Sequence, residues 1–152
     1  MNVVAARPPN YDAIVAKFPF AARAGVIFTY GQTIYNPSES TISPALKCHE
    51  SVHAQRQGDD PAEIEAWWVR YLEEPIFRTE EELLAHRAEY RAMKSWTRDP
   101  NAAARELNRI AERLAGPLYG GVLSLSAARR LILVDVDRKK VAKLLREQEA
   151  LA

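Results

Sequence analysis

The stretch KCHESVHAQRQ, residues 47–57, constrains the fold of this chain more than any other segment. It holds two of the three histidines, His49 and His53, and Glu50 follows directly after the first. Side chains four residues apart share one face of an α-helix, so a helix here would direct both imidazoles toward one point. Zinc accepts imidazole readily, and the intervening glutamate can take a proton from a zinc-bound water. The stretch therefore predicts a helical zinc site that needs a further ligand.

The flanking residues predict this helix independently of the histidines. Ser43 followed by Pro44 suits an N-cap and a first helical position, and Gly58 suits a C-terminal stop. We therefore expect a helix from about residue 44 to residue 57. Its histidine face would look into a cleft, whereas Cys48 would point away from the pair and be buried and inert.

The third ligand is expected from a different helix. The longer zinc motif, with a glycine and a third histidine, is not matched, because position 56 is arginine and position 59 is Asp59. In FRTEEELLAHRAEYRA, however, Glu82, His86 and Glu89 fall at i, i+4 and i+7 of a helix that Thr79 would open. We predict Glu82 as the ligand, Glu89 as the second choice, and Asp59 as a poor one.

His86 could stabilise the oxyanion of a tetrahedral intermediate or orient Glu82 as a hydrogen-bond partner. The competing interpretation is structural. The stripe could be a solvated charged face with an i,i+4 pair of Glu82 and His86, and the histidines upstream could be solvated or make ordinary hydrogen bonds. The histidine pair and the row of Glu82, His86 and Glu89 together favour a metal site more strongly than either group does by itself.

Composition sets the broad class of protein. The chain has 152 residues, which predicts one domain, residues 1–152, with a proper core. The net charge of +1 gives no reason to expect nucleic acid or an anionic membrane as partner. No apolar run is long enough to span a bilayer and no export signal is visible, so a cytoplasmic location is the default expectation, or a virion if the chain is phage-encoded. The single cysteine leaves histidine, aspartate and glutamate as metal ligands.

The other segments predict a mostly helical α+β fold. Residues 1–9 are expected to form an irregular arm before a short helix that Asn10 would cap. GVIFTYGQTIYNP predicts a short β-hairpin with Gly31 and Gln32 as its turn. Further helices are expected after Asp60-Pro61, after Asp99-Pro100 and at residues 126–131, with a charged and frayed C-terminal helix over 137–152. The aromatic side chains on the first of these are expected in the core, with a wall of the site as the alternative: Trp67, Trp68 and Tyr71.

The order of GVIFTYGQTIYNP, HESVHAQRQ and RYLEEPIFRTEEELLAHRAEYRA resembles small bacterial and phage-encoded gluzincin-like proteins, which are minimal relatives of thermolysin-type zinc peptidases. The resemblance lies at His49, Glu50, His53 and the ELLA segment that begins at Glu82, and it covers about residues 25–95. It implies a zincin-like fold, with one zinc ion on His49, His53 and Glu82 and with Glu50 as base. In such peptidases an edge strand beside the cleft pairs with the substrate backbone, a role for which the hairpin is the candidate.

Three functions are compatible with these patterns. The first is a zinc metallopeptidase that hydrolyses a peptide bond in a peptide or protein substrate through a zinc-bound water, with Glu50 as general base and His86 or Tyr90 steadying the oxyanion. The second is a non-catalytic zinc-binding structural or interaction protein, such as a phage virion component that contacts other virion proteins. The third is a regulatory module that cleaves or binds one specific partner.

Overall fold

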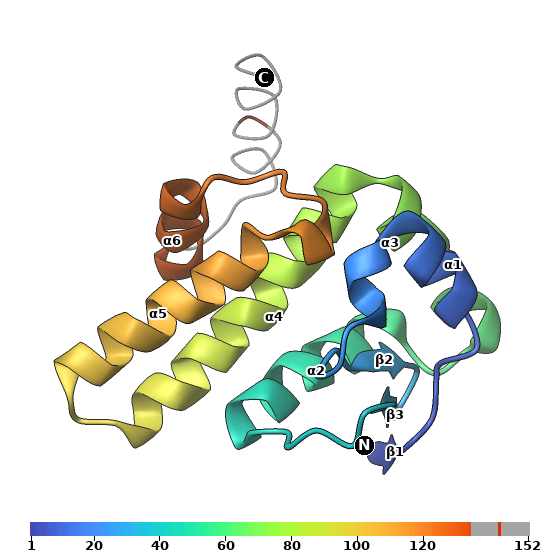
Figure 1. Ribbon diagram of the computed structural model, residues 1–152, viewed down its shortest axis with the longest axis horizontal. Helices are drawn as coiled ribbons and strands as arrows, with labels where there is room; N and C mark the ends of the chain where they lie inside the picture. Colours follow the sequence, from blue (N-terminus) through green and yellow to red (C-terminus); the bar gives the residue numbers. More distant parts are fainter. Residues whose placement is uncertain (135–142, 144–152) are drawn as a thin grey trace.

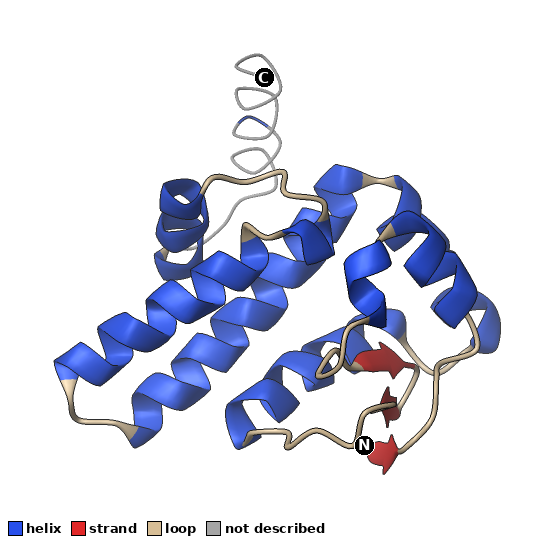
Figure 2. Ribbon diagram, viewed as in Figure 1, coloured by secondary structure: helices blue, strands red, loops and turns tan. Residues whose placement is uncertain are grey.

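The computed structural model describes residues 1–134 and residue 143, and it shows a mostly helical α+β fold with a small sheet (Figures 1 and 2). The elements follow one another as β1 Asn2–Val4, α1 Tyr11–Lys17, β2 Phe28–Tyr30, β3 Thr33–Tyr35, α2 Pro44–Gln57, α3 Pro61–Glu73, α4 Pro75–Trp96, α5 Pro100–Leu114 and α6 Leu125–Leu133. Short 3₁₀ turns lie at Pro19–Ala22 and Pro117–Tyr119. The predicted helix over 137–152 lies outside the described residues, apart from residue 143.

The sheet has the strand order β1-β3-β2, which leaves β2 at an edge. The predicted hairpin is confirmed: β2 and β3 pair antiparallel around a turn at Gly31, whose φ of 57° suits glycine. The prediction of an irregular arm over residues 1–9 is wrong in part, because β1 runs parallel to β3. Hydrogen bonds from Asn2 N to Gln32 O and from Asn36 N to Val4 O belong to this pairing. A strand of only three residues has too short a sequence pattern to be predicted.

The helix that carries the histidine pair begins and ends as predicted. Ser43 caps α2, since its side chain accepts a hydrogen bond from Leu46 N, and Pro44 is the first helical residue. Gly58 ends the helix with a φ of 77° and donates its N–H to Ala54 O. These two caps fix the residues at which the helix begins and ends.

The helix that carries Glu82 starts one turn earlier than predicted. It begins at Pro75, which follows Glu74, and Thr79 lies inside it with its hydroxyl bonded to Pro75 O at 2.8 Å. Pro75 therefore serves as the first residue of α4 rather than only as the end of α3, because a proline at that position lacks only an N–H that would be unpaired anyway. The later helix α6 is likewise capped by Ser124, which accepts from Ala127 N, and not by Ser126.

Two apolar cores flank the helix α4. One joins α4 to α5 and α6 through Leu83, Tyr90, Ile110 and their neighbours. The other joins α1, β2, α3 and the start of α4, and the predicted core aromatics all belong to it: Trp67, Trp68 and Tyr71. Between these cores α2 lies along α4 and packs against it more extensively than any other pair of described elements (Figure 1). In the described part of the chain, no helix has the length and apolar character needed to cross a membrane.

Candidate metal centre

The facing sides of α2 and α4 are polar although they are buried. On α2 the buried side includes His49, Glu50 and His53, and on α4 it includes Glu82 and His86. Burying charged groups is costly unless they are paired or bind a cation. Between α2 and α4, where an apolar core would be usual, the structure therefore has a buried cluster of titratable side chains.

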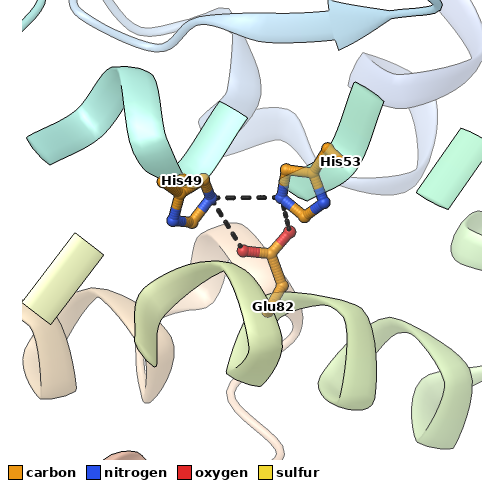
Figure 3. Close-up of side chains that lie close together, drawn as sticks. All are labelled: His49, His53 and Glu82. Carbon is orange, nitrogen blue, oxygen red and sulfur yellow. Dashed lines mark hydrogen bonds and ion pairs between the residues drawn. The ribbon is translucent and has the colours of Figure 1, made fainter. Parts of the chain in front are cut away.

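Three of these side chains converge on one point (Figure 3). Nε2 of His49 and Nε2 of His53 lie 3.1 Å apart, and Glu82 places its two carboxylate oxygens 3.5 Å from the first nitrogen and 3.3 Å from the second. Zinc with bonds of about 2.0–2.2 Å in a tetrahedron separates its ligand atoms by about 3.3 Å. The two imidazole nitrogens and the carboxylate oxygen that faces each of them therefore stand near the separations that one zinc ion needs.

The hydrogen bonding of Glu82 supports a role as ligand. Tyr71 donates its hydroxyl to Oε1, whereas Oε2 is buried without a hydrogen-bond partner among the described residues. Buried carboxylate oxygens are rarely left unpaired, and a metal ion would supply the missing partner. Tyr71 thus belongs both to the apolar core and to the wall of the site, the two alternatives for this residue, whereas its hydrogen bond to Glu82 was not predicted.

Glu50 lies beside these ligands without joining them. One of its oxygens is 3.9 Å from Nε2 of His49, and the other accepts a 2.6 Å hydrogen bond from Thr29 of β2. Burial raises the pKa of Glu50 to about 7, against the lowering effect of His53 and of the Thr29 hydroxyl. A carboxyl group with that pKa can take up and release a proton near neutral pH.

Glu89 and His86 form a second group behind His49. Oε2 of Glu89 is 3.4 Å from Nδ1 of His49 and 3.0 Å from Nδ1 of His86, and its other oxygen is bound by Arg113 of α5. These residues could also surround a cation with His49 as a common ligand. A neutral imidazole offers one lone pair, so His49 that binds through Nε2 uses Nδ1–H as a donor. Glu89 is the nearest carboxylate to this Nδ1, although the 3.4 Å contact does not have hydrogen-bond geometry here, and a carboxylate beside the second ring nitrogen is common at zinc sites.

Protonation in this cluster favours metal binding at Glu82. Burial raises the pKa of Glu82, but the charges and hydrogen bond of His53 and the charge of His49 bring it well below its usual range. Burial lowers the pKa of His49 to about 4, so this imidazole is neutral at pH 7. Burial also lowers the pKa of His53, yet the carboxylate of Glu82 outweighs this effect and raises it above its ordinary value. A metal ion therefore competes with a proton more strongly at His53 than at His49.

Two cavities reach this cluster. A small one of about 60 Å³ is lined mainly by apolar and aromatic side chains and touches His49, Glu50, His53 and Glu82. A larger one of about 620 Å³ also touches His49 and Glu50. Glu50 thus lies where both cavities meet, within reach of molecules that enter the larger one.

Tyr119 is a site residue that the sequence analysis did not single out. It lies in the 3₁₀ turn Pro117–Tyr119 and lines both cavities. Burial, with the charge of Glu82 adding to it, raises the pKa of its hydroxyl well above the usual value, so the group remains a hydrogen-bond donor. Glycines at positions 116, 120 and 121 mark this turn in the sequence but do not say where it packs.

The two predicted oxyanion donors lie elsewhere. His86 is fully buried, with Nε2 3.7 Å from Oε2 of Glu82, and it does not line either cavity. Tyr90 packs in the core between α4, α5 and α6. Asp59, the poor ligand candidate, is exposed and accepts a hydrogen bond from the side chain of Gln32. Cys48 is partly exposed and not buried as expected.

No protein-family model matches the chain, and no curated protein or solved structure matches it at a significant level. The resemblance to gluzincin-like proteins therefore rests on the residues quoted above.

Proposed function

We propose that this chain is a zincin-like zinc metallopeptidase that holds one zinc ion on His49, His53 and Glu82. The observation that carries the proposal is the convergence of these three side chains, with imidazole nitrogens 3.1 Å apart and a carboxylate oxygen 3.3–3.5 Å from each, beside the buried carboxyl group of Glu50. An imidazole pair with one carboxylate suits zinc better than magnesium or calcium, which prefer oxygen ligands. Three protein ligands leave a position open, as in catalytic rather than structural zinc sites.

A zinc ion at this position would polarise the scissile carbonyl and acidify a water molecule. Glu50 would accept the proton of the attacking water and pass it to the leaving amine, because its pKa of about 7 suits both transfers. The hydrogen bond from Thr29 holds the carboxyl group in place. Glu89 would keep His49 oriented through Nδ1, and Tyr71 would do the same for Glu82.

Tyr119 is better placed than His86 or Tyr90 to donate a hydrogen bond to the developing oxyanion. It alone of the three lines the cavities that reach Glu50. A neutral phenol loses no proton in this role, which its raised pKa supports. His86 would act through its contact with Glu89, as a residue that positions His49.

The edge strand β2 would bind the substrate backbone over a short length. Gln57 already occupies part of this edge, since its side chain bonds to Thr29 O and to Gly31 N. Ile27 lines both cavities, and its N–H and C=O have no hydrogen-bond partner in the described part of the chain. An extended peptide would pair with Ile27, in the manner of strand addition, and would be stopped by Gln57.

One observation favours a non-catalytic zinc site as the second candidate. His49, Glu50 and His53 are only 3%, 5% and 6% exposed, and the cavity next to all three ligands is small. A structural site is closed, whereas a catalytic one must admit a carbonyl group and a water molecule. The larger cavity at Glu50 is the reason to prefer catalysis.

The test combines metal analysis with cleavage of a peptide library. Wild-type protein is expected to hold one zinc per chain and to cleave peptides, and Glu50→Gln should keep the zinc and lose turnover. Gln preserves the size of the side chain and can still accept from Thr29, so the fold should survive. A wild-type protein without stoichiometric zinc would overturn the proposal, whereas zinc without any cleavage would favour the structural candidate.

A further inference from the structure

We propose that the larger cavity selects peptides with acidic residues beside the scissile bond, and that Arg23 and Arg7 bind those carboxylates. The inference rests on the proposed peptidase function and adds a substrate class to it. It depends on how arginine side chains are distributed around the cavity, a feature that the nearly balanced net charge of the chain does not reveal.

The wall of the larger cavity is rich in arginine. Arg23, Arg109 and Arg113 line it, together with one glutamate outside the catalytic cluster, Glu112. The same cavity reaches Glu50 and His49, so a peptide bond at the site would have neighbours close to this wall. Guanidinium groups bind carboxylates through two parallel hydrogen bonds, which favours acidic side chains at that place.

Two of these arginines already have partners. Arg113 binds the carboxylate of Glu89 and so belongs to the support of His49. Arg109 pairs with Glu106 at 2.7 Å, but both side chains are on the surface, where such pairs are weak. Neither arginine is therefore the principal anchor for a substrate, although Arg109 can turn toward a ligand at little cost.

Arg23 differs from both. Its guanidinium lies 4.2 Å from the centre of the Phe20 ring, and no carboxylate in the described part of the chain pairs with it. Stacking on the aromatic ring limits the rotamers of the side chain and leaves its N–H groups available. Arg23 also comes shortly before Ile27, the proposed backbone contact for substrate.

A second arginine extends this surface. Arg23 also lines a depression of about 230 Å³ that contains Arg7 and Ser38 and no acidic residue. Arg7 stacks on Tyr11 with 4.6 Å to the ring centre and, like Arg23, has no carboxylate partner among the described residues. The depression shares Arg23, Ala24 and Val26 with the larger cavity, so the two arginines without a carboxylate partner lie on adjoining hollows of the surface.

An acidic peptide fits this surface better than nucleic acid does. Arg23 lines the same cavity as the proposed catalytic carboxyl group of Glu50 and the backbone of Ile27, which has no hydrogen-bond partner among the described residues. Both features suit an extended polypeptide. Phenylalanine and tyrosine here are covered by guanidinium groups, so they are not free to stack on bases as in proteins that bind single strands.

Binding to a zinc-loaded Glu50→Gln variant tests the proposal without turnover. The probes are two short fluorescein-labelled peptides, one with Glu on both sides of an Ala-Leu centre and the other with Gln in those places. Fluorescence anisotropy should give about fivefold to tenfold tighter binding of the acidic peptide, as expected for two exposed ion pairs. Raising the ionic strength from about 0.1 M to about 1 M shortens the Debye length from about 10 Å to about 3 Å and should abolish the difference.

The double substitution Arg7→Gln and Arg23→Gln should make the two peptides equal. The matched control is Arg129→Gln with Arg130→Gln, two exposed residues of α6 that line neither the arginine-rich cavity nor the depression. It removes the same charge from the chain and should keep the acidic preference, which separates local recognition from net charge.

The remaining outcomes distinguish failure of the acidic preference from failure of the peptidase function. Equal binding of the two peptides by the Glu50→Gln variant, or a preference that persists without Arg7 and Arg23, would overturn the acidic specificity even if wild type cleaves peptides. A single-stranded oligonucleotide that binds more tightly than the acidic peptide would overturn the assignment to a peptide. Absence of any cleavage by the wild type, with the acidic preference intact, would overturn the peptidase function and leave the binding preference standing.

Discussion

Thr29 donates a 2.6 Å hydrogen bond from its hydroxyl group to Oε2 of Glu50. This contact joins the edge strand of the sheet to the helix that carries the two histidines of the proposed metal site, and both side chains are buried. The strand proposed to bind substrate therefore also sets the position of the proposed general base. The charge on this carboxyl group can be followed through the stability of the metal-free protein.

Metal-free protein should lose stability as the pH rises because of Glu50. Its pKa is about 7 in the folded chain against 4.5 as the ordinary value, so the folded state binds the proton more tightly between these pH values. The contribution of Glu50 to the free energy of unfolding therefore falls by about 3 kcal/mol from below pH 4.5 to above pH 7. Glu50→Gln removes this term, so its stability relative to wild type should increase with pH over that window.

Urea unfolding of both proteins in chelator, at pH 5 and pH 8, measures this difference. Because the comparison is between two proteins at each pH, the opposing titration of His49 is common to both. Thr29→Val provides a companion variant. The Thr29 hydrogen bond lowers the pKa of Glu50, so its loss should move the pH-dependent fall in stability to higher pH. A stability difference that is the same at both pH values would show that Glu50 is ionised in the folded protein throughout.

Glu82 and Glu89 should respond differently to the same substitution. Glu82→Gln removes a metal ligand, so stoichiometric zinc should be lost. Glu89→Gln removes only the acceptor beside Nδ1 of His49, which should weaken zinc binding by about 10-fold to 100-fold without abolishing it. Competition with a chromophoric chelator measures both constants, and loss of zinc in Glu89→Gln with retention in Glu82→Gln would reverse the assignment.

Sequence reasoning predicted the parts of this site that depend on helical spacing. His49, Glu50 and His53 are placed by capped helix α2, and Glu82, His86 and Glu89 share a buried face of α4, as the i, i+4 and i+7 pattern indicated. The three side chains share one face even though α4 begins at Pro75 rather than Thr79, because an earlier start leaves the relative positions of residues on a helix unchanged.

The parts that failed depend on tertiary contacts between distant segments. Thr29 and Tyr119 reach the site from the sheet and from a 3₁₀ turn, and neither is spaced with the ligands in the sequence. Tyr71 of α3 was a candidate for the wall of the site, but its hydrogen bond to Glu82 was not predicted. Strand β1 was missed for the same reason, since its three residues are defined by pairing with β3. Local periodicity identifies one face of one element, but it does not show which elements will meet.

Tyr119→Phe should lower kcat more than it changes zinc binding. The hydroxyl group would stabilise charge that develops only in the transition state, so its loss should cost about 10²–10³ in kcat, as for other single donors to an oxyanion. Phe keeps the ring that lines both cavities. His86→Gln is the comparison, because a positioning residue should weaken zinc binding through Glu89. Equal kcat for wild type and Tyr119→Phe would remove this hydroxyl from the mechanism.

Zinc should stabilise the fold by linking α2 to α4. The ligands come from both helices, so the ion binds the folded chain far more tightly than the unfolded one. At a free zinc concentration about 1,000 times the Kd, this linkage adds about 4 kcal/mol to the free energy of unfolding. Removal of zinc by a chelator should therefore lower the Tm of wild type, as measured by calorimetry, and should leave Glu82→Gln unaffected. Calcium should not replace zinc, because it prefers a larger set of oxygen ligands than two imidazoles and one carboxylate provide. An unchanged Tm in chelator would instead mean that the 3.1 Å contact between His49 and His53 is an ordinary hydrogen bond between two side chains.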